Sequence, residues 1–127
     1  MPQIHQEVTF AATPDRVYKA LTDSREFAAF TDAVAEISSH EGGAFTCFGG
    51  FVLGRNVELV ANTRVVQAWR VSNWPEGVYS IVRFELQADG EGAKLVLSQD
   101  GVPDDAVAHV DPGWHQKYWE PLRKYLA

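Results

Sequence analysis

Residues 112–122 read PGWHQKYWEPL and bring three large aromatic side chains, Trp114, Tyr118 and Trp119, close together near the end of the chain. Trp114, Tyr118 and Leu122 recur every four residues, which is the spacing of one face of an α-helix. A helix with this many aromatic residues needs a wide apolar surface to pack against. The stretch therefore predicts a helix lying on a sheet, with either a packed centre or a pocket between them.

Two prolines interrupt this helical pattern. Pro112 biases Asp111 away from helical backbone angles, and Pro121 lacks the N–H group that would bond the carbonyl of Lys117. Residues 103–105 offer a helix start, with a proline followed by two aspartates. We expect a long C-terminal helix with a break or restart near Asp111 and a kink near Lys117.

The preceding sequence changes to a period of two. Residues 4–10 alternate between apolar and polar side chains, which predicts a half-buried strand. Thr13 before Pro14, and Asp23 three residues before Glu26, predict the starts of two short helices. Six further strand-like segments follow, separated by turn residues: 34–38, 44–48, 55–61, 64–72, 78–88 and 93–99. We predict an α+β fold in which a curved antiparallel sheet of about seven strands wraps around the C-terminal helix.

Length and charge limit the function classes. A chain of 127 residues fits one domain, here residues 1–127. No segment reaches the roughly 20 apolar residues of a membrane span, so we expect no membrane insertion. The formal net charge of −6, with Lys and Arg scattered along the chain, opposes nucleic-acid binding and favours a neutral or weakly polar apolar guest.

The N-terminal residues and the single cysteine bear on location. Residues 1–5 contain neither the basic region nor the apolar region of a secretory signal. Cys47 has no second cysteine with which to form an internal disulfide, which fits a reducing compartment. We therefore expect a cytoplasmic protein.

Several short motifs together resemble one superfamily. They are Gly42-Gly43 before Phe45 and Phe48, Gly50 and Gly54 before Glu58, Trp69-Arg70, the strand pattern Ser80, Val82, Phe84, Glu85 and Leu86, and Gly113-Trp114 before residues 118–122. By these residues the chain resembles the helix-grip superfamily, which includes START lipid-transfer domains, birch-pollen allergens and polyketide cyclases. Within this START-like (SRPBCC) superfamily it resembles single-domain relatives of the activator of heat-shock chaperone ATPase.

The resemblance covers nearly the whole chain and implies a helix-grip fold, with an internal cavity in many members. Such relatives bind lipids, polyketides, flavonoid-like compounds or a chaperone, and those that activate the chaperone carry an additional domain for which this chain is too short. The chain departs from close relatives at Gln99, where a histidine often ends the seventh strand. Any role that the resemblance would give to that histidine is therefore in question.

Strand alternation and helical spacing predict which side chains face the interior. Because large rings fill space, we expect a small pocket rather than one of lipid size. Gln99, His115, Tyr118 and Glu58 are the polar groups that could orient a guest there. The predicted ligand-binding residues are Phe27, Phe30, Val57, Leu59, Trp69, Phe84, Leu97, Gln99, Trp114, His115, Tyr118 and Leu122.

The leading interpretation is binding of a small hydrophobic molecule, with no catalysis and no cofactor. A cyclase-like or hydrolase-like enzyme acting on a polyketide-like substrate, with Gln99, His115 and Tyr118 as acid–base groups, is the second. The third is a module that binds a chaperone, or pairs as a homodimer, through an exposed apolar patch containing Trp74 or Trp119. The four histidines lack metal-ligand spacing, so we expect no metal site.

Overall fold

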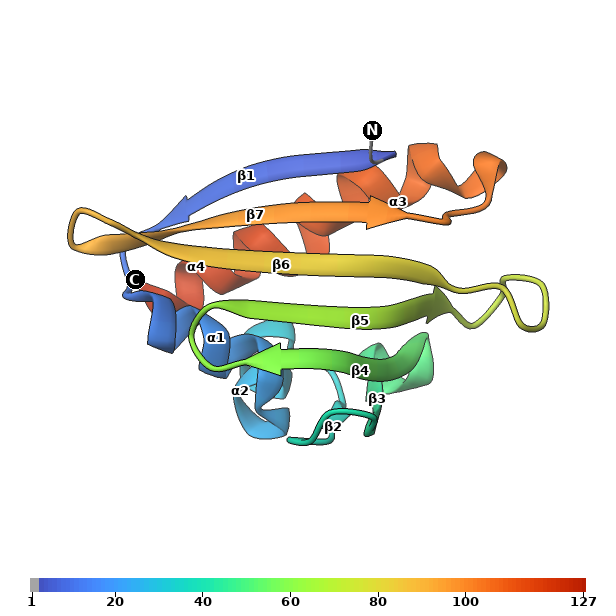
Figure 1. The fold of residues 1–127 in the computed structure, drawn as a ribbon, viewed down its shortest axis with the longest axis horizontal. Coiled ribbons are helices and arrows are strands. Elements are labelled where there is room, and N and C mark those ends of the chain that lie inside the picture. The colour runs from blue at the N-terminus through green and yellow to red at the C-terminus, as the bar shows by residue number, and fades with distance from the viewer. Residues whose placement is uncertain (1–2) are drawn as a thin grey trace.

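A computed structural model describes residues 3–127 (Figure 1). Met1 and Pro2, at the start of the segment searched for a secretory signal, lie outside the described residues. Within residues 3–127, seven strands form one antiparallel sheet in the order β1-β7-β6-β5-β4-β3-β2. The strands are β1 Ile4–Phe10, β2 Glu36–Ile37, β3 Ala44–Cys47, β4 Val52–Val60, β5 Arg64–Val71, β6 Ser80–Asp89 and β7 Gly92–Asp100.

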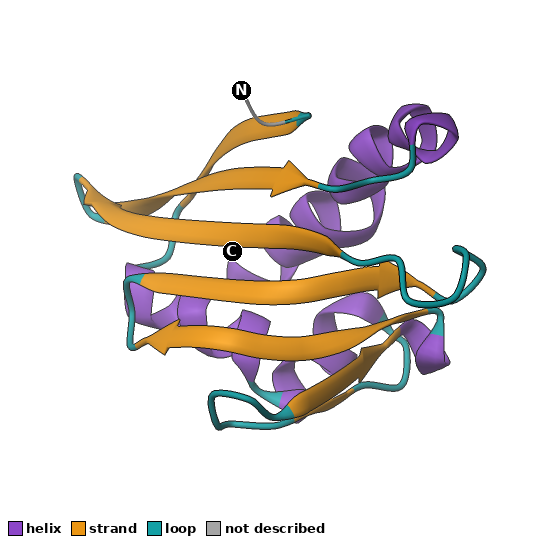
Figure 2. Cartoon of the chain, turned by 45° about the vertical axis from the view of Figure 1, so that its right-hand side comes forward, coloured by secondary structure: helices purple, strands orange, loops and turns teal. Residues whose placement is uncertain are grey.

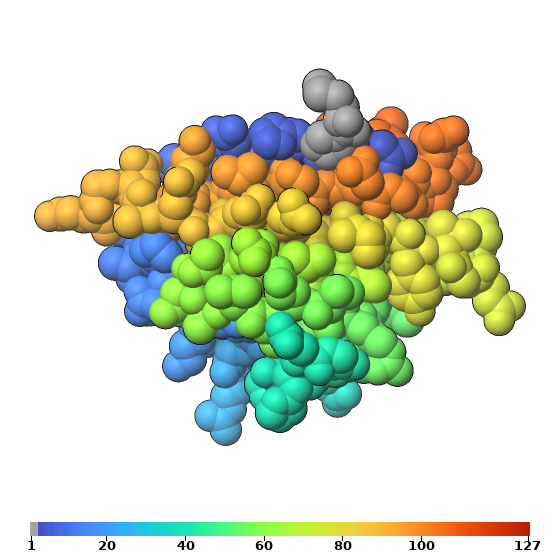
Figure 3. All heavy atoms as spheres, viewed as in Figure 1, coloured from blue at the N-terminus to red at the C-terminus, as the bar shows by residue number. Residues whose placement is uncertain are grey.

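The helices gather on one face of this sheet (Figure 2). They are α1 Pro14–Thr22, α2 Ser24–Thr31, η1 Phe48–Gly50, η2 Asp104–Ala106, α3 Val107–Trp114, η3 His115–Trp119 and α4 Glu120–Leu126. The elements from η2 to α4 follow one another without a gap and form the C-terminal helix, most of which is hidden by the sheet in the space-filling view (Figure 3). The predicted fold class is confirmed. In the described part of the chain, no helix is long and apolar enough to span a membrane.

Both predicted helix starts are confirmed, with a difference in how they are capped. Thr13 precedes α1 but makes no side-chain capping bond, and α1 begins instead with Pro14, whose fixed φ suits the first helical turn. The carboxylate of Asp23 caps α2 as expected. Its Oδ1 atom accepts hydrogen bonds from the backbone N–H groups of Arg25 and Glu26 at 2.9 and 3.0 Å.

The predicted break near Asp111 is wrong, because α3 continues through Asp111 and Pro112. Gln6 Nε2 of β1 donates to the backbone carbonyl of Asp111 at 2.9 Å and to its carboxylate at 2.6 Å. Val110, just before Asp111, and Trp114, two residues after Pro112, are both buried. These contacts hold the helical backbone against the extended preference of a residue before proline.

The irregularity predicted from Pro121 is present, in the form of the π-helical turn η3. Hydrogen bonds there span five residues, so the N–H of Glu120 donates to the carbonyl of His115. Pro121 then falls in the first turn of α4, where a missing N–H costs little. The wider turn allows the adjacent Tyr118 and Trp119 both to face the interior, where they are 5% and 1% exposed.

Aromatic rings fill the core between the C-terminal helix and the sheet. Trp114 stacks on Trp119 with ring centroids 5.7 Å apart, and Phe84 of β6 meets both rings edge-on. Leu97 of β7 and Leu122 of α4 are completely buried beside them. The space under the middle of the helix is therefore solid with side chains.

A β-bulge in β4 changes which side chains face this core. Asn56 pairs with Gln67, but the next pair along the strand is Glu58 with Val66, so Val57 is the additional residue. Its side chain is 53% exposed. The expectation that Val57 faces the interior is wrong, because a bulge breaks the simple alternation on which it depended.

Candidate functional site

A cleft of about 590 Å³ opens between the C-terminal helix and the end of the sheet where η1, β4 and β5 lie. Its walls are mostly apolar and aromatic, and its volume falls within the roughly 300–1,000 Å³ of small-molecule sites. The lining residues are Phe48, Phe51, Val52, Trp69, Val71, His109, Val110, Pro112, Gly113, Trp114, Gln116, Lys117 and Tyr118.

Gly113 leaves open space in the helix wall of the cleft. A Cβ atom added at this position would meet no atom within 4 Å. Val110 and Trp114 line the cleft on the same wall. A guest can therefore approach the helix backbone closely at Gly113, where any other residue would place a side chain.

The opposite wall depends on an unusual backbone turn, η1. Phe48, Gly49 and Gly50 have φ angles of 54°, 65° and 96°, a conformation that a bulky residue such as Phe rarely adopts. Phe48 packs edge-on against Tyr118 of the C-terminal helix, with ring centroids 5.6 Å apart, and both residues line the cleft. Phe51, which follows the turn, also lines the cleft and remains 47% exposed.

A buried chain of hydrogen bonds lies behind the aromatic walls. Trp114 Nε1 donates to Gln99 Oε1 at 2.8 Å, and Gln99 Nε2 donates to Ser80 Oγ at 3.0 Å. Ser80 Oγ in turn donates to the backbone carbonyl of Trp69 at 2.8 Å. The Gln99 amide therefore positions the Trp114 indole and lies behind the wall of the cleft.

Trp69 and Tyr118 place a neutral polar pair in the apolar wall. Trp69 Nε1 donates to Tyr118 Oη at 3.5 Å, which is long for a hydrogen bond of this type. Burial raises the pKa of Tyr118 well above its usual value, so its hydroxyl group is protonated at neutral pH. Both groups have the capacity to form a shorter hydrogen bond with a guest.

Three of the predicted site residues, Trp69, Trp114 and Tyr118, line the cleft. Leu59 is partly buried and packs against the core. The remaining inward-facing residues are buried in the packing behind or beside the cleft: Phe27, Phe30, Phe84, Leu97, Gln99 and Leu122. The predicted interior is thus divided into a solid core and a cleft at one end.

His115 is exposed and does not line the cleft. It follows the inward-facing Trp114, and successive helical side chains point about 100° apart. The structure therefore separates His115 from Gln99 and Tyr118, the other expected acid–base groups. Trp74 was expected on an exposed patch, but it packs against the core and is 7% exposed. Trp119, the alternative member of that patch, is also buried.

Ten of the thirteen lining residues are not among those predicted from the sequence, and they include Phe51, Val71, Gly113 and Lys117. Val71 lies two residues after Trp69 in β5, so strand alternation alone could have placed it on the same wall. Phe51 depends on the backbone of η1, which local sequence patterns do not reveal. Lys117 and Gly113 lie on the helix face that turns away from the solid core.

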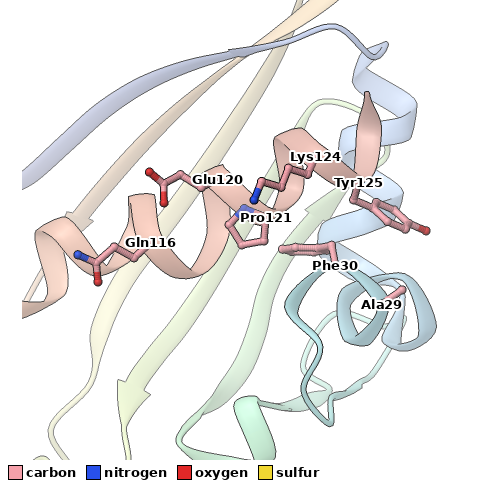
Figure 4. Close-up of a pocket in the computed structure, with 7 residues that line it drawn as sticks. All are labelled: Ala29, Phe30, Gln116, Glu120, Pro121, Lys124 and Tyr125. Carbon is pink, nitrogen blue, oxygen red and sulfur yellow. The ribbon is translucent and has the colours of Figure 1, made fainter.

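Two further hollows border the C-terminal helix. One of about 300 Å³ adjoins the cleft and shares Phe51, Val71, His109 and Val110 with it. The other, of about 450 Å³, lies between α2 and the C-terminal helix, where Phe30 faces Pro121 while Glu120 and Lys124 supply charged groups (Figure 4). The hollow beside α2 is smaller than the cleft and has two aromatic lining residues, Phe30 and Tyr125, whereas the cleft has five, so we take the cleft as the candidate site.

The single cysteine and the arrangement of potential metal ligands bear on reactive chemistry. Cys47 is buried in β3, and burial raises its pKa to about 12, so the thiol is protonated at neutral pH. Among residues 3–127, no group of three or more His, Cys, Asp and Glu side chains is placed to hold a metal ion.

A curved antiparallel sheet around a long C-terminal helix, with a cleft between the two, defines the class of helix-grip domains. Within this class, the family model described as "Activator of Hsp90 ATPase homolog 1-like protein" matches residues 11–127. The chain therefore belongs to this family.

Individual relatives agree with this assignment. Over 115 residues the chain is 30% identical to the "Activator of 90 kDa heat shock protein ATPase homolog" of Dictyostelium discoideum, covering 90% of this chain and 30% of that protein. A crystal structure described as an HSP90 activator from Plasmodium falciparum superposes with a TM-score of 0.86 at 24% identity, covering 94% and 93% of the two chains. The Aha1 dimer from Colwellia psychrerythraea gives a TM-score of 0.83 at 19% identity, covering 97% and 94%.

These similarities establish family and fold. At 24% and 19% identity, the two solved structures support the fold alone. The chain spans about a third of the length of the curated relatives it matches. What those longer proteins do is therefore a hypothesis for this chain.

Proposed function

We propose that this protein binds a small hydrophobic molecule in the cleft between its C-terminal helix and the sheet. The observation that carries the proposal is the bare backbone at Gly113, facing an aromatic wall across a cleft of about 590 Å³. A solid core elsewhere under the helix directs the guest to this end of the molecule. The proposal therefore keeps the predicted small pocket with aromatic walls, but places it at one end of the C-terminal helix.

The chemistry of the cleft walls supports an aromatic or similarly flat guest. Trp69, Trp114 and Phe48 offer ring faces and edges, and aromatic pairs gain about 0.5–1.5 kcal/mol beyond the area they bury. The weakly bonded Trp69 indole and Tyr118 hydroxyl supply the few polar groups that orient a ligand in such sites.

The test is binding of the neutral fluorescent probe N-phenyl-naphthylamine to the protein and to Gly113→Leu. The added leucine side chain enters the open space at Gly113, so we expect the probe to bind at least tenfold more weakly, about 1.4 kcal/mol. Leucine is a better helix former than glycine, so the variant is expected to fold. Probe fluorescence gives the affinity, and circular dichroism checks the fold.

Ala108→Leu is the matched control, because it adds the same side chain to an exposed position of α3 that does not line the cleft. It should bind the probe as the unmodified protein does. Equal affinity in all three proteins would place the probe elsewhere and overturn the proposal, as would absence of binding to the unmodified protein.

The other interpretations stay predictions. The expected acid–base groups do not lie together in the structure, so no specific observation supports an enzymatic activity. The two tryptophans expected on an exposed patch are buried, so none supports protein binding through that patch. The curated relatives are named as activators of a heat-shock protein ATPase, and those proteins are about three times as long as this chain.

A further inference from the structure

Resting on the proposed function, we infer that the cleft selects aromatic acids, with Lys117 contacting the acid group and the aromatic walls holding the ring system. The net charge of −6 argues for a neutral guest. The side chains that line the cleft favour an anionic guest instead. Because they lie nearest to the guest, they decide which charge it carries.

The lining residues of the cleft, all within the described range, include one lysine, Lys117, and no Arg, Asp or Glu. This local composition opposes that of the whole chain, which has 17 acidic and 11 strongly basic residues. At physiological ionic strength the screening length is about 8 Å, so distant surface charges act weakly on a guest in the cleft. The groups that touch the guest therefore decide which charge it can carry.

Lys117 is available to such a guest. In the part of the chain that the structure describes, no ion pair joins Lys117 to a carboxylate. The nearest acidic residues along the helix are directed elsewhere. Asp111 accepts hydrogen bonds from Gln6 of β1, and Glu120 lines the separate hollow beside α2 (Figure 4).

The position of Lys117 suits an amphiphilic guest. Lys117 is an exposed residue with a flexible side chain, while Gly113, one turn earlier on the same helix, opens the apolar part of the cleft. A ring system placed against Gly113 and Trp114 can therefore direct an acid group toward Lys117. Asp105 lines the adjoining hollow, and its negative charge disfavours an anion there relative to the lysine end of the cleft.

The experiment compares naphthoic acid with its neutral isostere naphthamide at neutral pH, by isothermal titration. An exposed charge pair contributes up to about 1 kcal/mol, so we expect the acid to bind roughly threefold to fivefold more tightly than the amide. Raising the salt concentration should weaken binding of the acid and leave that of the amide unchanged.

Lys117→Gln should abolish the preference for the acid while keeping the affinity for the amide. Lys124→Gln, which removes a lysine of the same helix that lines the other hollow, is the matched control and should keep the preference. If both compounds bind equally to the unmodified protein, or if Lys117→Gln keeps the preference, the inference is wrong and the proposed function stands. If neither compound nor the neutral naphthylamine probe binds, the proposed function itself fails.

Discussion

At the scale of single residues, Gln99 shows how a buried polar group organises an apolar site. Its amide is completely buried, accepts from the Trp114 indole and donates to Ser80. A buried amide without partners would cost several kcal/mol, so the position tolerates Gln only because both ends are bonded. Gln99 thereby fixes the orientation of one cleft wall without touching the guest.

Replacement of Gln99 by leucine tests this role. Gln99→Leu leaves the Trp114 N–H buried without an acceptor, and we expect the free energy of unfolding to fall by about 1–3 kcal/mol in urea titrations. Gln87→Leu, at an exposed position of the neighbouring strand β6, is the control and should change it by less than about 0.5 kcal/mol. A loss no larger than that of the control would mean that the hydrogen bonds of Gln99 are dispensable.

At the scale of elements, the C-terminal helix contains residues that stabilise it, the buried aromatic side chains, and one that destabilises it, a glycine in its interior. Trp114, Tyr118 and Trp119 bury large aromatic areas against the sheet. Gly113 works against the helix, because glycine in a helix interior is less stable than alanine by roughly 0.5–1 kcal/mol. This glycine lies at a position where a side chain would enter the open space of the cleft.

Gly113→Ala should therefore raise the stability of the protein. Its backbone does not need the positive φ that glycine permits, and a methyl group there meets no neighbour within 4 Å. We expect a gain of about 0.5–1 kcal/mol, seen by calorimetry as a melting temperature higher by roughly 2–6 °C. A lower melting temperature would show that another part of the molecule needs the space at Gly113.

At the scale of the whole molecule, burial links stability to alkaline pH. The pKa of Cys47 is raised from 9.0 to about 12 by burial, so the folded protein keeps this proton when the unfolded chain has lost it. The contribution is complete below pH 9.0 and is lost as pH rises from there toward 12. The buried hydroxyl of Tyr118 acts in the same direction.

Urea titrations at pH 8 and pH 10 measure this dependence. From Cys47 we expect the free energy of unfolding to fall by roughly 1 kcal/mol over this interval. The variant Cys47→Ala should show a correspondingly smaller fall, since the tyrosine contribution remains. The same dependence in both proteins would exclude Cys47 as its source.

The sequence predicts the architecture of the molecule better than its cleft. Alternation in residues 4–10 and turn residues between the later segments predict the strands because hydrophobic period and turn chemistry are local properties. Val57 and Phe51 are misplaced or missed because a bulge and a run of positive φ angles arise from packing between segments. Asp111 stays helical because Gln6, distant in sequence, bonds to it.

The π-helical turn η3 makes the shape of the interior sensitive to chain length. A π-turn holds one residue more than an α-helical turn, so removing one residue between His115 and Trp119 would restore ordinary α-helical spacing while α4 keeps its place on the sheet. Only one ring of the adjacent Tyr118 and Trp119 could then face the interior, where both are now buried. In this fold a single-codon deletion can thus remodel a binding pocket as deeply as the exchange of several of its wall residues.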